Sequence, residues 1–170
     1  MEDIINHGES YILHNGENMI WYFFLGENKK IGYIIKDGEN WSPVNKLDSQ
    51  PLKGYSVTMD KAGIIRLLAY TETKYLIYYE FSQGRWSNRT LERIHSRFQD
   101  ITYYNIQSSP LGTHIIYYLN HSLSRSSETL VHYYISRGKW QGGPLWRFIS
   151  DQFTRPLDVH SSAMGKHSII

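Results

Sequence analysis

At 170 residues, with 15% aromatic and 41% hydrophobic residues, the chain is long enough to build one domain around a packed core. Its 18 basic and 16 acidic residues form no block of like charge, which argues against the clustered basic surface of a nucleic-acid-binding protein. The chain has no cysteine, which excludes disulfides, thiol catalysis and cysteine-ligated zinc.

The amino-terminal stretch MEDIINHGES carries acidic residues where a secretory signal has a basic start followed by an apolar run. The longest apolar run, residues 19–25, is far shorter than the roughly 20 residues that a membrane-spanning helix needs. We therefore expect a soluble, cytoplasmic protein without a membrane partner.

Three stretches share one pattern: IGYIIKDGENW (31–41), IYYEFSQGRW (77–86) and VHYYISRGKW (131–140). Aligned on their glycines, they form columns two residues apart, which is the side-chain period of a β-strand. The columns hold Ile31, Ile77 and Val131, then Tyr33, Tyr79 and Tyr133, then Ile35, Phe81 and Ile135, followed by Gly38, Gly84 and Gly138 and by Trp41, Trp86 and Trp140. Each unit therefore predicts a strand, a glycine turn and a strand that carries the tryptophan.

A second glycine column lies upstream, at Gly16, Gly63, Gly112 and Gly165, with spacings of 47, 49 and 53 residues. The fourth residue after each of these glycines is apolar, namely Ile20, Leu67, Ile116 and Ile169. A period near 50 residues with four short strands in each unit is typical of a propeller blade.

We expect an all-β, propeller-like single domain over residues 1–170. Its four-stranded antiparallel blades are predicted at about 10–47, 54–92 and 100–146, with a partial fourth at 157–170. In the first blade the strands are predicted at 10–15, 18–25, 29–37 and 40–44. The stretch RTLERIHSRF (89–98) has helix-compatible spacing, but a loop between blades is the preferred interpretation, so little helix is expected.

Repeats of this length that end on a tryptophan after a glycine resemble the β-propeller families, and KDGENW (36–41) is most similar to the lectin type. The resemblance covers nearly the whole chain and implies carbohydrate binding. Fucose-binding propellers carry a second-strand Arg and a third-strand Glu in each repeat. The alignment offers Arg66 for the arginine, beside Met19 and Ile115, and puts Tyr33, Tyr79 and Tyr133 in the glutamate column. It therefore predicts no fucose site of that kind.

The candidate ligand-binding residues are Trp41, Trp86, Trp140, Arg66 and His114. Indole rings stack on sugar faces and offer an N–H donor, whereas the alternative is that each tryptophan packs between blades. His114 and His167 share a repeat column and would face one channel, or they are ordinary strand residues. The eight histidines lack the paired spacing of zinc sites, so we expect no metal or cofactor. Arg66 and Glu80 are predicted to form a cross-strand ion pair.

No nucleophile elbow or phosphate-binding glycine loop is present in the sequence. We therefore expect a non-enzymatic binding module that recognises a glycan or a protein through one propeller face. A glycan-active hydrolase or lyase with a site in a central channel is the alternative.

Three blades and part of a fourth leave unpaired edges, and closed propellers have roughly 4–8 blades. We expect a homodimer in which residues 157–170 of each chain pair with residues 10–25 of its partner. A ring of three chains, or a longer parent chain that closes its own ring, are the alternatives.

Overall fold

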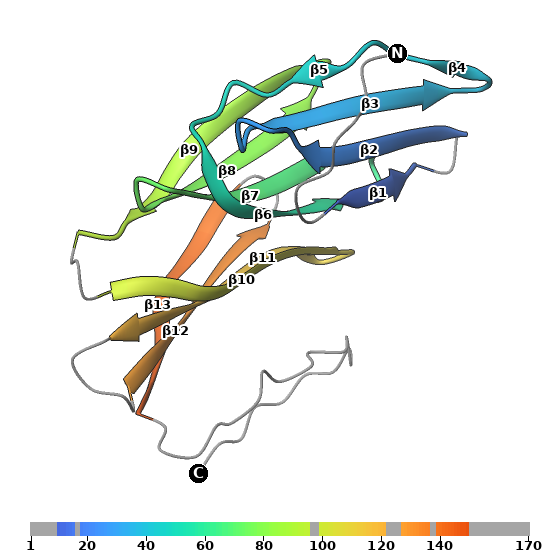
Figure 1. Ribbon diagram of the computed structural model, residues 1–170. Coiled ribbons are helices and arrows are strands. Elements are labelled where there is room, and N and C mark those ends of the chain that lie inside the picture. Colours follow the sequence, from blue (N-terminus) through green and yellow to red (C-terminus); the bar gives the residue numbers. More distant parts are fainter. Residues whose placement is uncertain (1–9, 16–17, 96–98, 122–126, 137–138, 150–170) are drawn as a thin grey trace.

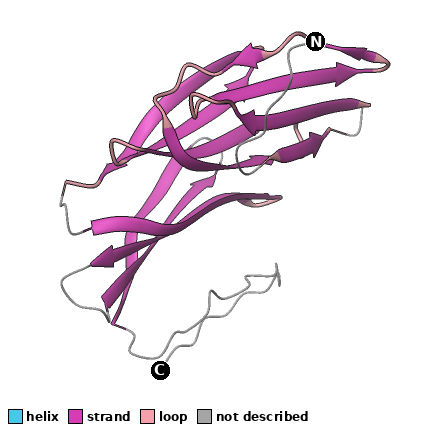
Figure 2. Cartoon of the chain, in the orientation of Figure 1, coloured by secondary structure: helices cyan, strands magenta, loops and turns pink. Residues whose placement is uncertain are grey.

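The computed structural model describes residues 10–15, 18–95, 99–121, 127–136 and 139–149. In these ranges the chain consists of strands and short connections, and no helix is formed (Figure 2). The described part accordingly contains no helix that could span a membrane. The all-β expectation is confirmed.

The strands form three antiparallel sheets in chain order (Figure 1). The first sheet contains β1 (Tyr11–His14), β2 (Met19–Leu25), β3 (Ile31–Asp37), β4 (Asn40–Trp41) and β5 (Asn45–Lys46). The second contains β6 (Leu52–Met59), β7 (Ile65–Thr71), β8 (Tyr75–Ser82) and β9 (Arg85–Arg93). The third contains β10 (Gln99–Ser109), β11 (Gly112–His121), β12 (Ser127–Ser136) and β13 (Lys139–Ile149). Each sheet is open, and the three are stacked face to face.

The first sheet is a four-stranded unit whose last strand is interrupted. Both β4 and β5 pair with β3, and Pro43 lies between them. Proline has no N–H to give to a β-ladder, so the strand breaks there. Ser42 bridges the break, because its Oγ accepts a hydrogen bond from Ile35 N at 3.0 Å while its own N donates to Ile35 O at 2.7 Å.

The repeat units use their hairpin glycines differently. Asp37 pairs with Asn40, so Gly38 is the first residue of a two-residue turn, with φ +57°. In the second sheet Ser82 pairs with Arg85, and positive φ falls on both Gln83 and Gly84. These features are those of type II′ and type I′ turns, which need a positive φ at the first position or at both. Glycine therefore marks different turn positions in the two units.

This difference makes the glycine-based alignment wrong by one residue along the first sheet. The strand pairs place Trp41 opposite Lys36, Trp86 opposite Phe81 and Trp140 opposite Ile135, so the tryptophan column is correct. Counting back from the tryptophans, Ile34, and not Tyr33, is equivalent to Tyr79 and Tyr133. Their partners on the second strands are Tyr22, Leu67 and Ile115, which corrects the predicted column of Ile20, Leu67 and Ile116.

Alternating side chains give the second sheet two buried faces and produce two cores. The first core lies between the first and second sheets and includes Phe23, Ile31, Tyr55, Leu67 and Tyr79. The second lies between the second and third sheets and includes Leu68, Leu76, Ile106, Ile115 and Tyr117. Residues one apart along β7 thus belong to different cores, as the period of two dictates.

The tryptophans of the second and third units pack across these boundaries. Trp86 lies edge-on to Tyr33 and Phe23 of the first sheet, and its Nε1 donates to Tyr33 Oη at 3.2 Å. Trp140 meets Tyr78 of the second sheet edge-on, with ring centroids 4.9 Å apart. Each therefore joins its own sheet to the sheet before it.

The expected loop at 89–98 is partly strand, because β9 continues to Arg93 and the Ile94 N–H then donates to Lys74 O at 3.0 Å. Ile94 is buried, which explains the apolar residue at that place. Gly16, Gly138, Gly165, His167 and the partial blade at 157–170 lie outside the described residues.

Replacing Trp86 with alanine tests its bridging role. Trp86→Ala should lower the free energy of unfolding by about 3–5 kcal/mol, because it removes a large ring packed between two sheets. Trp86→Phe should cost less, since it keeps an aromatic ring and loses the bond to Tyr33. Chemical denaturation measures both, with the exposed Asn88→Ala on the same strand as control, expected within about 0.5 kcal/mol of wild type. Equal stability of Trp86→Ala and the control would contradict the packing described.

Candidate functional site

An open cleft of about 790 Å³ lies at the boundary between the second and third sheets. This volume is within the usual range of small-molecule sites. The second sheet contributes Asp60, Ile64 and Arg66, and the third contributes Ser109, Pro110, Leu111, Gly112, Thr113, Tyr134, Ile135, Ser136 and Lys139. The cleft thus forms between the β6–β7 turn and the neighbouring ends of β10 to β13.

Arg66 on β7 is the polar centre of this cleft, and its side chain is largely buried. Its Nη1 donates to Asp60 Oδ2 at 2.6 Å, and its Nε donates to Glu80 Oε2 at 3.2 Å. Glu80 stands directly opposite Arg66 on β8. The predicted cross-strand ion pair is confirmed, and Asp60 is a second carboxylate on the same guanidinium.

The β6–β7 turn fixes Asp60 in place. Its Oδ1 accepts hydrogen bonds from Ala62 N at 2.9 Å and Ile64 N at 3.0 Å, which leaves Oδ2 for Arg66. Gly63 adopts φ +77° in this turn, a conformation that glycine reaches without steric cost. The orientation of the guanidinium is therefore set by two carboxylates that are themselves held by the sheet.

Burial by itself raises the pKa of Asp60, but the hydrogen bond from Arg66 and the two backbone N–H groups outweigh it and lower the pKa below 3.8. Burial likewise lowers the pKa of Arg66, but its hydrogen bond to Asp60 and its charge interactions with Tyr78, Asp60 and Glu80 outweigh this and raise the pKa above its ordinary value. Both groups are charged at neutral pH. With its pKa lowered, Asp60 is not the proton donor that glycoside hydrolysis needs.

Glu80 connects the cleft to the aromatic contact between the sheets. Tyr78 Oη donates to Glu80 Oε2 at 2.7 Å. The pKa of Tyr78 is raised, with burial as the largest cause and this hydrogen bond as the second. The Tyr78 ring meets the Trp140 ring edge-on. The guanidinium carbon of Arg89 lies over the Trp140 ring, 5.0 Å from its centroid. Arg66, Glu80 and Trp140 therefore belong to one connected arrangement across the boundary.

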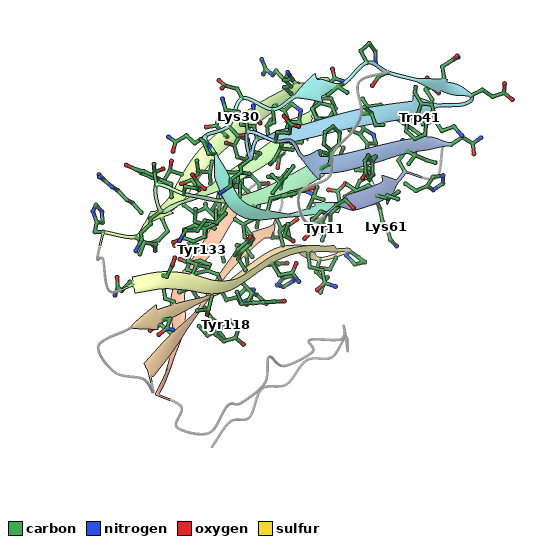
Figure 3. The ribbon with its side chains drawn as sticks, viewed as in Figure 1. Tyr11, Lys30, Trp41, Lys61, Tyr118 and Tyr133 are labelled. Atoms are coloured by element: carbon green, nitrogen blue, oxygen red, sulfur yellow. The ribbon has the colours of Figure 1, made fainter. Side chains whose placement is uncertain are left out.

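The structure separates the five residues predicted to bind ligand. Arg66 and Trp140 lie at the boundary of the second and third sheets, and Trp86 lies at the boundary before it. Trp41 lies at the edge of the first sheet with 53% of its surface exposed, and Lys36 Nζ is 5.7 Å from its ring centroid (Figure 3). His114 is on the face of the third sheet that points away from the second.

His114 Nδ1 lies 3.0 Å from His132 Nε2, so the two imidazoles share a hydrogen bond. Their rings are nearly parallel, and the His114 ring also contacts Tyr134, with centroids 4.9 Å apart. Burial lowers the pKa of both histidines, and the charge of His114 lowers that of His132 further. Among the described residues, no group of three or more potential metal ligands occurs.

Sequence reasoning missed Asp60 and assigned the glutamate position to the wrong column. With the correct strand register, Arg66 is equivalent to Trp21 and His114, and Glu80 is equivalent to Ile35 and Tyr134. The available signal was the spacing from Asp60 through Gly63 to Arg66, in which a turn aspartate precedes a strand arginine. At this pair of equivalent positions, opposite charges are thus present in the second sheet and in neither of the other two.

No protein-family model and no curated protein matches the chain. Among solved structures, the SapL1 lectin in complex with α-methyl fucoside is similar, with a TM-score of 0.57 and 16% identity over 84% of this chain. The alignment covers 47% of SapL1, so the chain spans about half the length of that lectin. A fucose lectin from Kordia zhangzhouensis in complex with methyl-fucoside has a TM-score of 0.47 and 16% identity, over 82% of this chain and 100% of that one. The similarity to SapL1 shows a shared all-β fold.

The histidine pair predicts acid sensitivity. Because the folded-state pKa values lie below 6.5, the unfolded chain takes up protons first as the pH falls, and stability is lost from about pH 6.5 down through the folded pKa. His114→Gln should therefore lose less stability than wild type between about pH 7 and pH 5. Denaturation at both pH values measures this, with the exposed His14→Gln as control. A parallel loss in wild type and His114→Gln would contradict the assignment.

Proposed function

We propose that this protein is a non-enzymatic carbohydrate-binding module that holds a neutral sugar in the cleft between its second and third sheets. One observation carries the proposal: Arg66 on the second strand and Glu80 on the third strand of the middle sheet are paired in register beside the cleft. The sequence resembles the lectin-type propellers, and the fucose-binding propellers use this combination. SapL1, which shares the fold, was solved with α-methyl fucoside. A 6-deoxyhexose such as fucose is the proposed ligand.

The chemistry of the cleft suits a neutral sugar. A guanidinium has five N–H donors, and the bonds to Asp60 and Glu80 account for two, so others are available to sugar hydroxyls. The two carboxylates compensate the charge of Arg66, which disfavours its use as a receptor for an anion. Ile64, Leu111 and Ile135 add apolar surface suited to the C–H face or methyl group of a sugar.

The other sheet boundary lacks this chemistry, which supports one such site in the described part of the chain. Trp21 and Ile35 occupy the places of Arg66 and Glu80 there. Trp21 is 5% exposed, and its ring meets Phe81 with centroids 5.0 Å apart. Apolar packing therefore fills the equivalent space at the first boundary.

We further propose that the three sheets are consecutive blades of one propeller domain over residues 1–170. Two boundaries of the same kind support this arrangement, since Trp86 and Trp140 each pack on the sheet that precedes their own. The sheets also have the same orientation in the stack. In the second sheet, the face that carries Arg66 points to the next sheet, and the face that carries Tyr79 points to the previous one.

Removing the charged pair should abolish sugar binding. Arg66→Ala and Glu80→Gln should each weaken binding of α-methyl fucoside at least tenfold, because a hydrogen bond to a charged group contributes about 1.5–3 kcal/mol. Isothermal titration calorimetry measures the affinity, with Arg85→Ala, exposed at the start of β9, as control. Wild-type affinity in Arg66→Ala would exclude this site, and release of free fucose from a nitrophenyl fucoside would exclude a purely binding role.

Asp60 is expected to act by orienting Arg66. Asp60→Asn keeps an oxygen for the N–H groups of Ala62 and Ile64 but removes the carboxylate that receives Arg66 Nη1. Affinity for α-methyl fucoside should fall severalfold, while the far-ultraviolet circular dichroism spectrum stays unchanged. Asp37→Asn, exposed at the end of β3, is the matched control. Unchanged affinity in Asp60→Asn, together with loss of binding in Arg66→Ala, would limit Asp60 to a role in the turn.

A further inference from the structure

The outward face of the first sheet is apolar and has no sheet packed on it among the described residues. Ile12, Tyr22 and Ile34 stand opposite one another across β1, β2 and β3 and form a continuous row. Ile12 is 71% exposed, and Trp41 on β4 is 53% exposed. Large exposed apolar rows of this kind mark interaction surfaces on folded proteins.

Trp41 shows what kind of contact this face is built for. It is equivalent to Trp86 and Trp140. Each of the three tryptophans pairs with a residue of the preceding strand, and in all three units that residue lies the same number of positions before the hairpin turn. Trp86 packs on the first sheet and Trp140 packs on the second. Trp41 has the same position in its sheet, but no earlier sheet lies before it in the described chain.

The opposite end of the stack presents the surface on which such a tryptophan packs. The outward face of the third sheet carries His114, Ile116, Tyr118, His132 and Tyr134. In register these residues are equivalent to Arg66, Leu68, Tyr70, Tyr78 and Glu80 of the second sheet, the face that the third sheet covers. Figure 3 shows Trp41 on the first sheet and Tyr118 on the third, at opposite ends of the stack.

We infer that a second copy of this chain covers both faces. The outward face of the first sheet in one copy packs on the outward face of the third sheet in the other, and two such contacts close a ring of six sheets around a two-fold axis. The contact repeats the geometry of the two boundaries inside the chain. Six blades lie within the roughly 4–8 of closed propellers.

The new boundary differs chemically from the sugar cleft. His114 and Tyr134 stand where the second sheet has Arg66 and Glu80, and His132, the equivalent of the Tyr78 that meets Trp140, faces the partner's Trp41. Aromatic and imidazole rings replace the charged pair, so this boundary joins the copies and the dimer carries one sugar cleft per chain. This inference does not depend on the proposed sugar, since the joining surfaces include neither Arg66 nor Glu80, although Tyr134 also lines the cleft.

Multi-angle light scattering on the full chain tests the assembly. At micromolar concentration the expected mass is twice the 20.0 kDa of one chain. A mass of one chain would overturn the inference, and so would a mass of three chains. Deletion of residues 150–170 tests another occupant of the face. If the full chain is a monomer and the deletion increases the exposure of Trp41, that segment covers the face and the second copy is excluded.

Charge-introducing variants test which surfaces meet. Trp41→Arg alters the first sheet and Ile116→Arg alters the third, so each alone should give a monomer of unchanged circular dichroism spectrum. An equimolar mixture should regain a dimer, because one of its two boundaries then has both surfaces intact. Lys61→Glu, exposed in the β6–β7 turn, is the control that stays dimeric.

Two results would overturn this head-to-tail arrangement. If Ile116→Arg stays dimeric while Trp41→Arg does not, the first sheets of the two copies face each other. If both variants are monomeric and their mixture does not associate, the two surfaces do not meet. Should Ile116→Arg fail to fold, Tyr103→Arg replaces it, since Tyr103 is 40% exposed and pairs with Tyr118 on the same face, with ring centroids 5.7 Å apart.

Discussion

The packing of a tryptophan from one sheet onto the sheet before it is the contact on which the rest of this structure depends. Trp86 and Trp140 each reach across a boundary and meet a tyrosine edge-on. These contacts fix which faces of the sheets are buried, and the alternation of side chains along each strand then divides the apolar residues between two cores. The cleft lies at the second boundary, the one that Trp140 crosses.

The polar centre of the cleft follows from the same stacking. Burying a lone guanidinium would be costly, and Asp60 and Glu80 offset that cost by binding it from two directions. Asp60 is held by the turn, and Glu80 is held by Tyr78, whose ring rests against Trp140. The proposed sugar-binding group, Arg66, is therefore positioned by the boundary that joins the sheets, so the candidate site and a packing contact share residues.

Much of the fold was predictable from the sequence, because strand alternation and a repeated tryptophan are local signals. The three sheets and the absence of helix in the described chain follow from them. The site was not predictable in the same way. Gly38 and Gly84 occupy different positions of two turn types, so a glycine-based alignment shifts the first unit by one residue. The Arg66–Glu80 pair was predicted as an ion pair, but the strand register was needed to show that Glu80, and not Tyr79, occupies the position equivalent to Ile35 and Tyr134.

A crystal structure of the protein with α-methyl fucoside would locate the bound sugar. We expect it between β7 and the neighbouring ends of β11 to β13, with its hydroxyls hydrogen-bonded to the Arg66 guanidinium and its C–H face against the apolar lining. The bonds from Arg66 to Asp60 and Glu80 should persist in the complex. A sugar bound at another boundary, or on the outward face of a sheet, would contradict binding at Arg66.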